Sequence, residues 1–294
     1  NSEIDILKSL KKVYKKIKIT PRGDKLLLEG ENTDILKLCV VLDSLIYFLK
    51  QNENLNESNL NQIIKGKGDK LLKPESGRVI LFGTNKKKIK AHTLNQIKII
   101  EAFENNDMVF AIGPAGTGKT YTGVALAVKA LKDKDVKRII LTRPAVEAGE
   151  NLGFLPGDLK DKLDPYMQPL YDALKEMIQI EKLDDYIKRG IIEIAPLAYM
   201  RGRTLDNAFV ILDEAQNTTE NQMKMFLTRM GKKAKFMITG DPGQIDLPKS
   251  SMSGLKQANI LLQKIDGIDI IYLDGSDVIR HKLVRSIIDA YNTK

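Results

Sequence analysis

Several residue types are scarce in this chain of 294 residues, and each shortage excludes a class of protein. Cys39 is the only cysteine, so no disulfide can form within the chain. The two histidines, His92 and His281, have no other metal ligands beside them, which argues against a zinc site. No apolar run reaches the ~18 residues that a membrane-spanning helix needs. We therefore expect neither a disulfide scaffold, a zinc protein nor a membrane protein.

The N-terminal residues carry no sign of export. The stretch from Asn1 to Asp5 lacks a basic segment followed by an apolar one and a small-residue cleavage site. Cys39 lies among leucines and valines at helical spacing, which is typical of a core thiol in a cytosolic protein; a reactive thiol is the alternative. These features predict a cytoplasmic location.

What the chain has in excess is positive charge, and that charge is unevenly placed. The net charge is +9, and residues 1–92 contain 19 Lys and Arg against 11 Asp and Glu, whereas the remainder contains 28 against 27. Lysine and arginine supply the sequence-independent part of nucleic-acid affinity, so RNA or DNA is a candidate partner. A general bias toward lysine explains the same excess, and runs such as Lys86-Lys87-Lys88 are usually solvated faces or linkers.

The patterning divides the chain into a small domain, a linker and a larger domain. Residues 1–82 predict a basic α+β domain, 83–92 a linker, and 93–294 the second domain. In the first domain we expect strands at 13–19, 25–28 and 78–82, a long helix beginning at Asn32 or Thr33, and a short helix at 58–64.

In the second domain apolar runs alternate with helical patterns. The expected strands lie at 108–112, 138–142, 191–194, 209–212, 236–239 and 268–273. This alternation predicts an α/β fold in which a parallel sheet is covered by helices on both faces.

One segment between an expected strand and an expected helix fits the phosphate-loop pattern G-x-x-x-x-G-K-[ST]. It reads Gly113-Pro114-Ala115-Gly116-Thr117-Gly118-Lys119-Thr120. Glycine allows backbone N–H groups to approach phosphate oxygens closely, and the start of the next helix adds unpaired donors. Lys119 is predicted to contact the β and γ phosphates, and the Thr120 hydroxyl to ligate Mg²⁺. A glycine-rich turn that only begins a helix is the alternative.

Two further strand ends carry polar residues. The strand 209–212 runs into Asp213 and Glu214. Asp213 suits an outer-shell role that holds the waters on Mg²⁺, and Glu214 suits activation of the water that attacks the γ-phosphate. The strand 236–239 runs into Asp241 and Gln244, and a glutamine amide can hold a water. Helix-capping charge and a plain Asp-Pro-Gly turn are the structural alternatives. Because ligands bind at the C-terminal ends of parallel strands, we expect all these residues to meet at one crevice.

Together with other segments, these motifs resemble the PhoH-like ATPases. The resemblance covers residues from about 93 to 292. It is carried by Thr93–Gln96, the phosphate loop, Thr142–Val146, Gly149–Gly157, Arg201–Thr204, Asp213–Asn217, Gly240–Gln244 and Asp277–His281.

The resemblance implies more than the patterns do. It implies a P-loop, RecA-like core similar to the motor domains of superfamily 1 helicases, a ring oligomer such as a hexamer, and a role in RNA metabolism. The N-terminal third resembles the KH-type module of the short PhoH-like proteins, through Arg22-Gly23-Asp24 and the strand after it. No PIN nuclease domain is present in this sequence, so nuclease activity is not implied.

The resemblance also assigns individual roles. Gln96 is expected to bind adenine, although a surface glutamine is an equal interpretation from the residue alone. Gln244 is expected to sense the γ-phosphate, and Arg280 is the candidate arginine finger, with Arg201 and Arg203 as rivals and a salt bridge to Asp277 as the alternative. Arg143 is expected either to contact RNA or to pair with Glu147 or Glu150.

The sequence thus predicts a Mg²⁺-dependent enzyme that binds and hydrolyses ATP in a cycle coupled to RNA binding, remodelling or unwinding. The alternative is a nucleotide-gated adaptor that recruits an endoribonuclease or a ribosome-maturation factor, with slow hydrolysis as a timer. A small-molecule kinase is disfavoured, because Glu214 and Gln244 suit the positioning of water.

Overall fold

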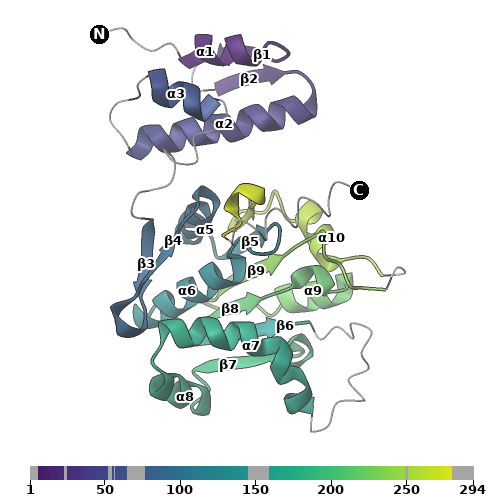
Figure 1. The fold of residues 1–294 in the computed structure, drawn as a ribbon. Coiled ribbons are helices and arrows are strands. Elements are labelled where there is room, and N and C mark those ends of the chain that lie inside the picture. The colour runs from purple at the N-terminus through teal and green to yellow at the C-terminus, as the bar shows by residue number, and fades with distance from the viewer. Residues whose placement is uncertain are drawn as a thin grey trace. The chain divides into compact units, whose positions relative to one another are not determined.

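The chain forms two compact units, residues 1–77 and 78–294 (Figure 1). The structure is a computed structural model that describes residues 6–22, 25–51, 55, 57–64, 77–144, 159–248 and 251–279. Among the described helices, none is both long enough and apolar enough to cross a membrane.

The first unit packs three helices with a two-stranded antiparallel hairpin. Its elements are α1 (Ile6–Val13), β1 (Lys18–Arg22), β2 (Lys25–Glu29), α2 (Asn32–Gln51) and α3 (Glu57–Ile64). Apolar side chains from all three helices, from β1 and from the residue before β1 form its core: Leu10, Ile17, Ile19, Leu38, Val41, Leu45, Phe48, Leu60, Ile63 and Ile64. Both predicted helices, 32 onward and 58–64, are present.

The start of this unit differs from the expectation. The first strand begins at Lys18 rather than at residue 13, because Ile6 and Leu10 recur at helical spacing and pack into the core from α1. Cys39 is half-buried in α2 rather than fully enclosed. Gly23 and Asp24 lie outside the described residues, so the KH-like assignment stays a prediction.

The second unit begins with a hairpin where a linker was expected. The strand β3 (Arg78–Phe82) pairs antiparallel with β4 (Lys88–Ala91), across the short helix η1 (Thr84–Lys86). Gly83 N donates to Lys87 O at 2.8 Å and closes the turn. Ile89 and Ala91 are buried, so alternate residues of a short, lysine-rich strand supply the apolar contacts. The division between the units therefore falls at residue 77 rather than after residue 82.

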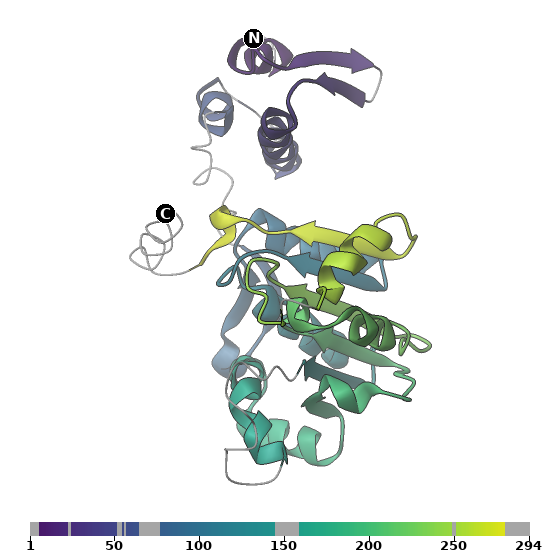
Figure 2. The same ribbon diagram turned by 90° about the vertical axis from the view of Figure 1, so that its right-hand side faces the viewer.

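A six-stranded sheet forms the centre of the second unit, as Figure 2 shows from the side. Its strands are β5 (Met108–Ile112), β6 (Arg138–Arg143), β7 (Ile192–Pro196), β8 (Ala208–Leu212), β9 (Lys235–Gly240) and β10 (Ile268–Tyr272). They lie in the order β10-β5-β9-β8-β6-β7, and every neighbouring pair is parallel. The α/β class and all six predicted strands are confirmed.

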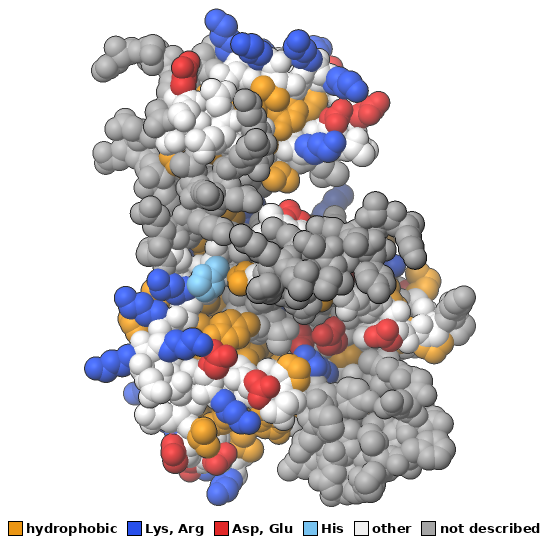
Figure 3. All heavy atoms as spheres, in the orientation of Figure 1, with side chains coloured by type: hydrophobic (Ala, Val, Ile, Leu, Met, Phe, Trp, Pro, Cys, Tyr) orange, Lys and Arg blue, Asp and Glu red, His pale blue; other side chains and the backbone are white. Residues whose placement is uncertain are grey.

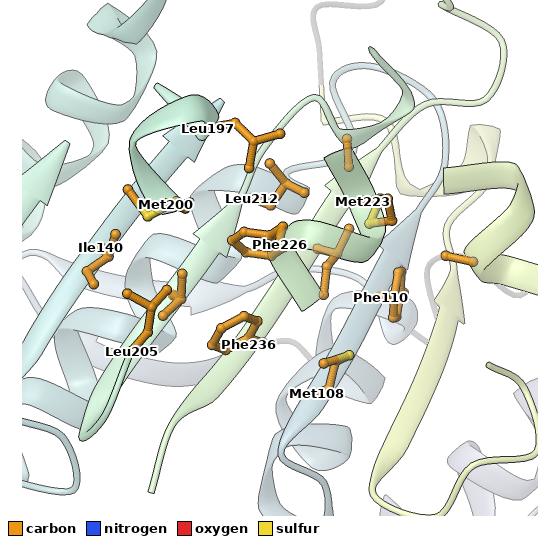
Figure 4. Packing of buried hydrophobic residues seen from close by; sticks show 14 of the residues in the cluster. Met108, Phe110, Ile140, Leu197, Met200, Leu205, Leu212, Met223, Phe226 and Phe236 are labelled. Carbon is orange, nitrogen blue, oxygen red and sulfur yellow. The ribbon is translucent and has the colours of Figure 1, made fainter. Parts of the chain in front are cut away.

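Helices cover both faces of this sheet. They are α5 (Leu94–Asn105), α6 (Lys119–Lys132), α7 (Leu159–Met177), α8 (Ile180–Lys188), α9 (Glu220–Leu227) and α10 (Gly254–Leu261). On one face Phe226 of α9 packs against Phe236 of β9, with ring centroids 5.0 Å apart, inside the cluster drawn in Figure 4. On the opposite face α6 approaches β9 so closely that a Cβ on Gly123 would lie 2.6 Å from Met237 Sδ.

This layering determines where the polar motifs lie. The central strands are apolar on both faces because helices bury both, which is typical of parallel sheets. Polar side chains are therefore concentrated where strands end, and the C-terminal ends of β5, β8 and β9 lead into the segments at Gly113, Asp213 and Asp241.

Candidate nucleotide-binding site

The loop from Gly113 to Thr120 joins β5 to α6 and is held in place on both sides. Gly113 N donates to Gly240 O at 3.0 Å, and a Cβ at Gly113 would lie 2.4 Å from Leu273 O. Gly118, the residue before α6, has φ of 78° in the left-handed region that favours glycine. The glycines therefore form a tight turn whose backbone leads into a helix N-terminus, as a phosphate loop requires.

Lys119 lies within this loop rather than in solvent. Its side chain is buried, and Nζ donates to the carbonyl oxygens of Gly113 at 2.7 Å and Pro114 at 2.8 Å. The loop's own backbone thus fixes the position of the ammonium group beside the first residues of α6.

Thr120 and Asp213 meet, as the sequence predicted. Thr120 Oγ1 donates to Asp213 Oδ1 at 2.7 Å, and Asp213 is buried at the end of β8. Thr239 of β9 also donates its hydroxyl to Asp213 Oδ1. Thr239 was not among the predicted site residues, although its place one residue before Gly240, at the end of a predicted strand, was a signal for it.

Arg143, at the end of β6, pairs with the same carboxylate. Its Nε donates to Asp213 Oδ2 at 2.8 Å, and Nη2 donates to the same oxygen. The described contact is therefore with Asp213, which was not among the expected partners. Glu147 and Glu150, the expected pairing partners, lie outside the described residues.

Glu214 follows Asp213 in a left-handed backbone conformation, with φ of 54°. Such a conformation is costly for a residue other than glycine and is found disproportionately at functional sites. Gln216 Nε2 donates to Glu214 Oε2 at 2.7 Å, while Gln216 Oε1 accepts from Asp241 N at 3.0 Å. Asp241 Oδ2 in turn accepts from Ala115 N in the loop at 3.1 Å. Gln216, for which the sequence suggested no role, thus connects the two acidic motifs.

These residues line one cavity of about 460 Å³. It brings together Lys119, Thr120, Asp213, Glu214 and Gln244, with Ala115, Gly116, Gly118 and Asp241 beside them. The predicted convergence of three strand ends is therefore present. The exposed side chain of Gln244 lies at the rim, after the turn that Gln244 N closes on Asp241 O.

Helix α7 supplies a wall of this cavity that the sequence did not suggest. Pro169, Asp172, Ala173 and Glu176 line it, together with Tyr121 of α6. Tyr121 Oη donates to Glu176 Oε2 at 3.1 Å, and Lys87 Nζ donates to the same oxygen. Burial, followed by the hydrogen bond to Glu176, raises the pKa of Tyr121 to about 12. The Lys87 hydrogen bond lowers the pKa of Glu176 despite its partial burial.

Gln96, expected to bind adenine, has its amide turned toward the protein. Its Oε1 accepts from His92 N at 2.7 Å, and its Nε2 donates to Thr117 O at 2.8 Å. The side chain is buried and packs against Gly118, where an added Cβ would lie 2.7 Å from Nε2. Gln96 therefore supports the phosphate loop, and its contact with adenine stays a prediction.

The three arginines considered as a finger have different surroundings. Arg203 forms a bidentate pair with Glu193, at 2.6 and 2.7 Å, and this hydrogen bonding raises its pKa. Arg201 is exposed and lines a separate cavity of about 300 Å³ with Leu197 and Met225. Arg280 lies outside the described residues. Asp277, its suggested partner, is buried and accepts hydrogen bonds from Asn95 Nδ2 and Asp274 N.

The donors at this site fit Mg²⁺. The Thr120 hydroxyl and the Asp213 carboxylate are hard oxygen donors, and Mg²⁺ is usually bound by one or two carboxylates plus substrate phosphates. Across the part of the chain that the structure describes, no group of three or more His, Cys, Asp or Glu side chains is placed to hold a metal ion. The donor chemistry therefore matches a metal that arrives with a phosphorylated ligand.

A parallel sheet whose strand ends bring a phosphate loop, its lysine and an acidic pair to one cavity defines a P-loop nucleoside triphosphatase fold. The family model described as "PhoH-like protein" matches residues 88–292. This chain belongs to the PhoH-like family.

Relatives of similar length support this membership. The PhoH-like protein of Bacillus subtilis (strain 168) is 51% identical over 279 residues, which cover 94% of this chain and 88% of that one. The PhoH-like protein of Mycobacterium tuberculosis (strain H37Rv) is 49% identical over 273 residues, 92% of this chain and 77% of that one. Among solved structures, the Pif1 helicase from Candida albicans aligns with a TM-score of 0.39 and 14% identity, over 70% of this chain and 44% of that one. A likeness this weak says nothing about activity.

Proposed function

We propose that this protein is a Mg²⁺-dependent ATPase whose cycle is coupled to RNA. The observation that supports it best is that Lys119, Thr120, Asp213 and Glu214 line one cavity, with Thr120 and Asp213 hydrogen-bonded to each other. A phosphate-binding loop, a metal-binding pair and a carboxylate for water activation are the parts that ATP hydrolysis needs.

Binding of the triphosphate begins at the loop. Backbone N–H groups from Gly116 to Thr120 surround the phosphates, and Lys119 moves its ammonium from the carbonyls of Gly113 and Pro114 to the β and γ phosphate oxygens. Thr120 and Asp213 would hold Mg²⁺, and the ion would supply positive charge against the phosphate oxygens. Gln96 keeps the loop in shape through Thr117 O and is also the candidate for adenine recognition.

Cleavage depends on Glu214 and on a positioned water. Glu214 accepts the proton of the attacking water, and Gln216 holds its carboxylate through the 2.7 Å hydrogen bond. Gln244 reaches the rim of the cavity and senses the γ-phosphate. Arg280 is the proposed finger, delivered from a neighbouring subunit of a ring, so that hydrolysis depends on assembly.

Coupling to RNA is proposed because of the charge of the first unit. Exposed lysines follow one another along α1 and the turn after it: Lys8, Lys11, Lys12, Lys15 and Lys16. Lys and Arg side chains gather over these first elements in Figure 3. A basic surface of this kind binds the phosphate backbone of a nucleic acid without reading its sequence.

Phosphate release from ATP tests the proposal, measured with Mg²⁺ alone and then with single-stranded RNA or single-stranded DNA. We expect Mg²⁺-dependent turnover that rises with RNA, together with a larger mass in solution when ATP is present. If neither nucleic acid changes the rate of ATP hydrolysis, then the coupling of hydrolysis to RNA is refuted. The adaptor would then be the remaining function, in which a protein partner binds only the ATP-bound state. If the protein neither binds nor hydrolyses ATP, then the proposal that it is an ATPase is refuted.

A further inference from the structure

The Asp213 carboxylate is engaged by four donor atoms on three different elements. Its Oδ1 accepts from Thr120 Oγ1 and Thr239 Oγ1, and its Oδ2 accepts from Arg143 Nε and Nη2. The Asp213 side chain is 3% exposed and that of Arg143 is 14% exposed. A carboxylate oxygen accepts about two hydrogen bonds, so both oxygens of Asp213 are filled.

A metal ion at this site would affect the hydrogen bonds of the two Asp213 oxygens differently. When a threonine hydroxyl ligates a cation through its oxygen, its hydrogen still points to a neighbouring acceptor, so the Thr120 contact with Oδ1 is compatible with a metal. Oδ2 has no such freedom, because a guanidinium holds it through two donors. A cation, or a water bound to it, that approaches Oδ2 must displace at least one Arg143 donor.

Charge explains why an arginine occupies this place. A carboxylate as buried as Asp213 is strongly destabilised unless a cation lies beside it. Arg143 supplies that cation from the end of β6, while Thr120 and Thr239 contribute only neutral dipoles. Both Arg143 and Asp213 line the cavity of the phosphate loop, so the guanidinium and the carboxylate border the same space.

We propose that Arg143 is a displaceable counter-ion of Asp213: it holds the carboxylate until a metal–nucleotide complex binds, and it then gives up Oδ2. Arg143 is thus a positioning residue that sets the metal affinity of the site. This inference rests on the proposed function, because it takes the cavity as the site of the metal–nucleotide complex. Arg143 precedes Pro144 at the end of β6, so its release moves a charge at the start of the connection that follows this strand.

Manganese binding tests this role apart from catalysis. Electron paramagnetic resonance measures the concentration of free Mn²⁺ as the protein is added, with and without ADP. Arg143→Met removes the charge and the donors, so we expect Mn²⁺ to bind about tenfold more tightly or more, as the loss of a competing charged hydrogen bond implies. Arg143→Lys keeps the charge and loses the planar fork, and its affinity should fall between those of wild type and Arg143→Met.

A matched control and a double variant separate this role from general damage. Arg203→Met removes a different arginine–carboxylate pair of the same unit, the partly buried bidentate pair with Glu193, and should leave Mn²⁺ affinity unchanged. In an Asp213→Asn background, Arg143→Met should no longer alter Mn²⁺ affinity, because the competition is for that carboxylate.

The outcomes distinguish this inference from the proposed function. If wild type binds Mn²⁺ with ADP, and a folded Arg143→Met protein binds it equally or more weakly, then the counter-ion role is wrong and the nucleotide site stands. If wild type binds neither Mn²⁺ nor ADP, then the site itself is refuted, and this role with it.

Discussion

Thr120 Oγ1 donates a 2.7 Å hydrogen bond to Asp213 Oδ1, across 93 positions of the chain. This bond joins the phosphate loop after β5 to the acidic motif after β8, although β9 lies between the two strands in the sheet. Thr239 of β9 donates to the same oxygen, so all three strand ends meet at one carboxylate. The residue that would hold Mg²⁺ is therefore also the residue on which the motifs converge.

Replacement of Lys119 by alanine should abolish tight ATP binding. The variant loses the only loop side chain that carries a positive charge, and charged hydrogen bonds of this kind imply a loss of about a hundredfold in affinity. Isothermal titration calorimetry measures the ATP affinity, and circular dichroism checks that the variant is folded. Lys129→Ala is the control, since this exposed lysine of the same helix pairs with Asp133. Equal affinity in wild type and Lys119→Ala would refute the assigned phosphate site.

Replacement of Glu214 by glutamine should separate binding from turnover. Gln216 still has a hydrogen-bond acceptor beside it, but the base is gone, so phosphate release should fall by about 10²- to 10⁴-fold. ATP affinity should stay within about threefold, a change below about 1 kcal/mol. Single-turnover measurements with excess enzyme give both quantities. The control is Glu220→Gln, which changes the next acidic residue along the chain and should alter neither turnover nor ATP affinity. A Glu214→Gln protein with normal turnover would exclude Glu214 as the base.

Two threonines near the ends of β6 and β9, the strands on either side of β8, should respond differently to replacement by valine. Thr239→Val removes a buried donor to the Asp213 carboxylate, and the free energy of unfolding should fall by about 1 to 3 kcal/mol. Thr142 is equally buried, but its Oγ1 has no partner among the described residues, so Thr142→Val should be neutral or stabilising. Urea denaturation compares the two variants. Equal destabilisation would show that the Asp213 contact contributes nothing specific.

More of the fold than of the site could be predicted from the sequence. The strands of the large sheet follow from apolar runs, since burial on both faces leaves a plain signal, and the phosphate loop follows from its glycines. The contacts of Arg143 and Thr239 do not follow, because they depend on which strand ends become neighbours in the sheet. The contact of Gln96 with Thr117 O does not follow either, because it depends on how α5 lies beside the phosphate loop. The strand at Lys88 was missed because only Ile89 and Ala91 are apolar in a basic segment.

Stability in acid should depend in part on Glu176. Hydrogen bonds from Lys87 and then Tyr121 lower the pKa of this carboxyl below its ordinary value of 4.5. A depressed folded pKa stabilises the protein above the unfolded pKa, and that contribution is lost as the pH falls through the folded pKa. Glu176→Gln should therefore be less stable than wild type at about pH 7, and the gap should close below about pH 4. The side chains of Lys87 and Glu176 are 57% and 45% exposed, so the gap should not exceed about 1 kcal/mol. The midpoints of urea denaturation across this pH range measure the stability difference between wild type and Glu176→Gln. Lys87→Met is expected to remove most of the same pH dependence. A gap of constant size down to about pH 3 would show that the ion pair contributes nothing to it.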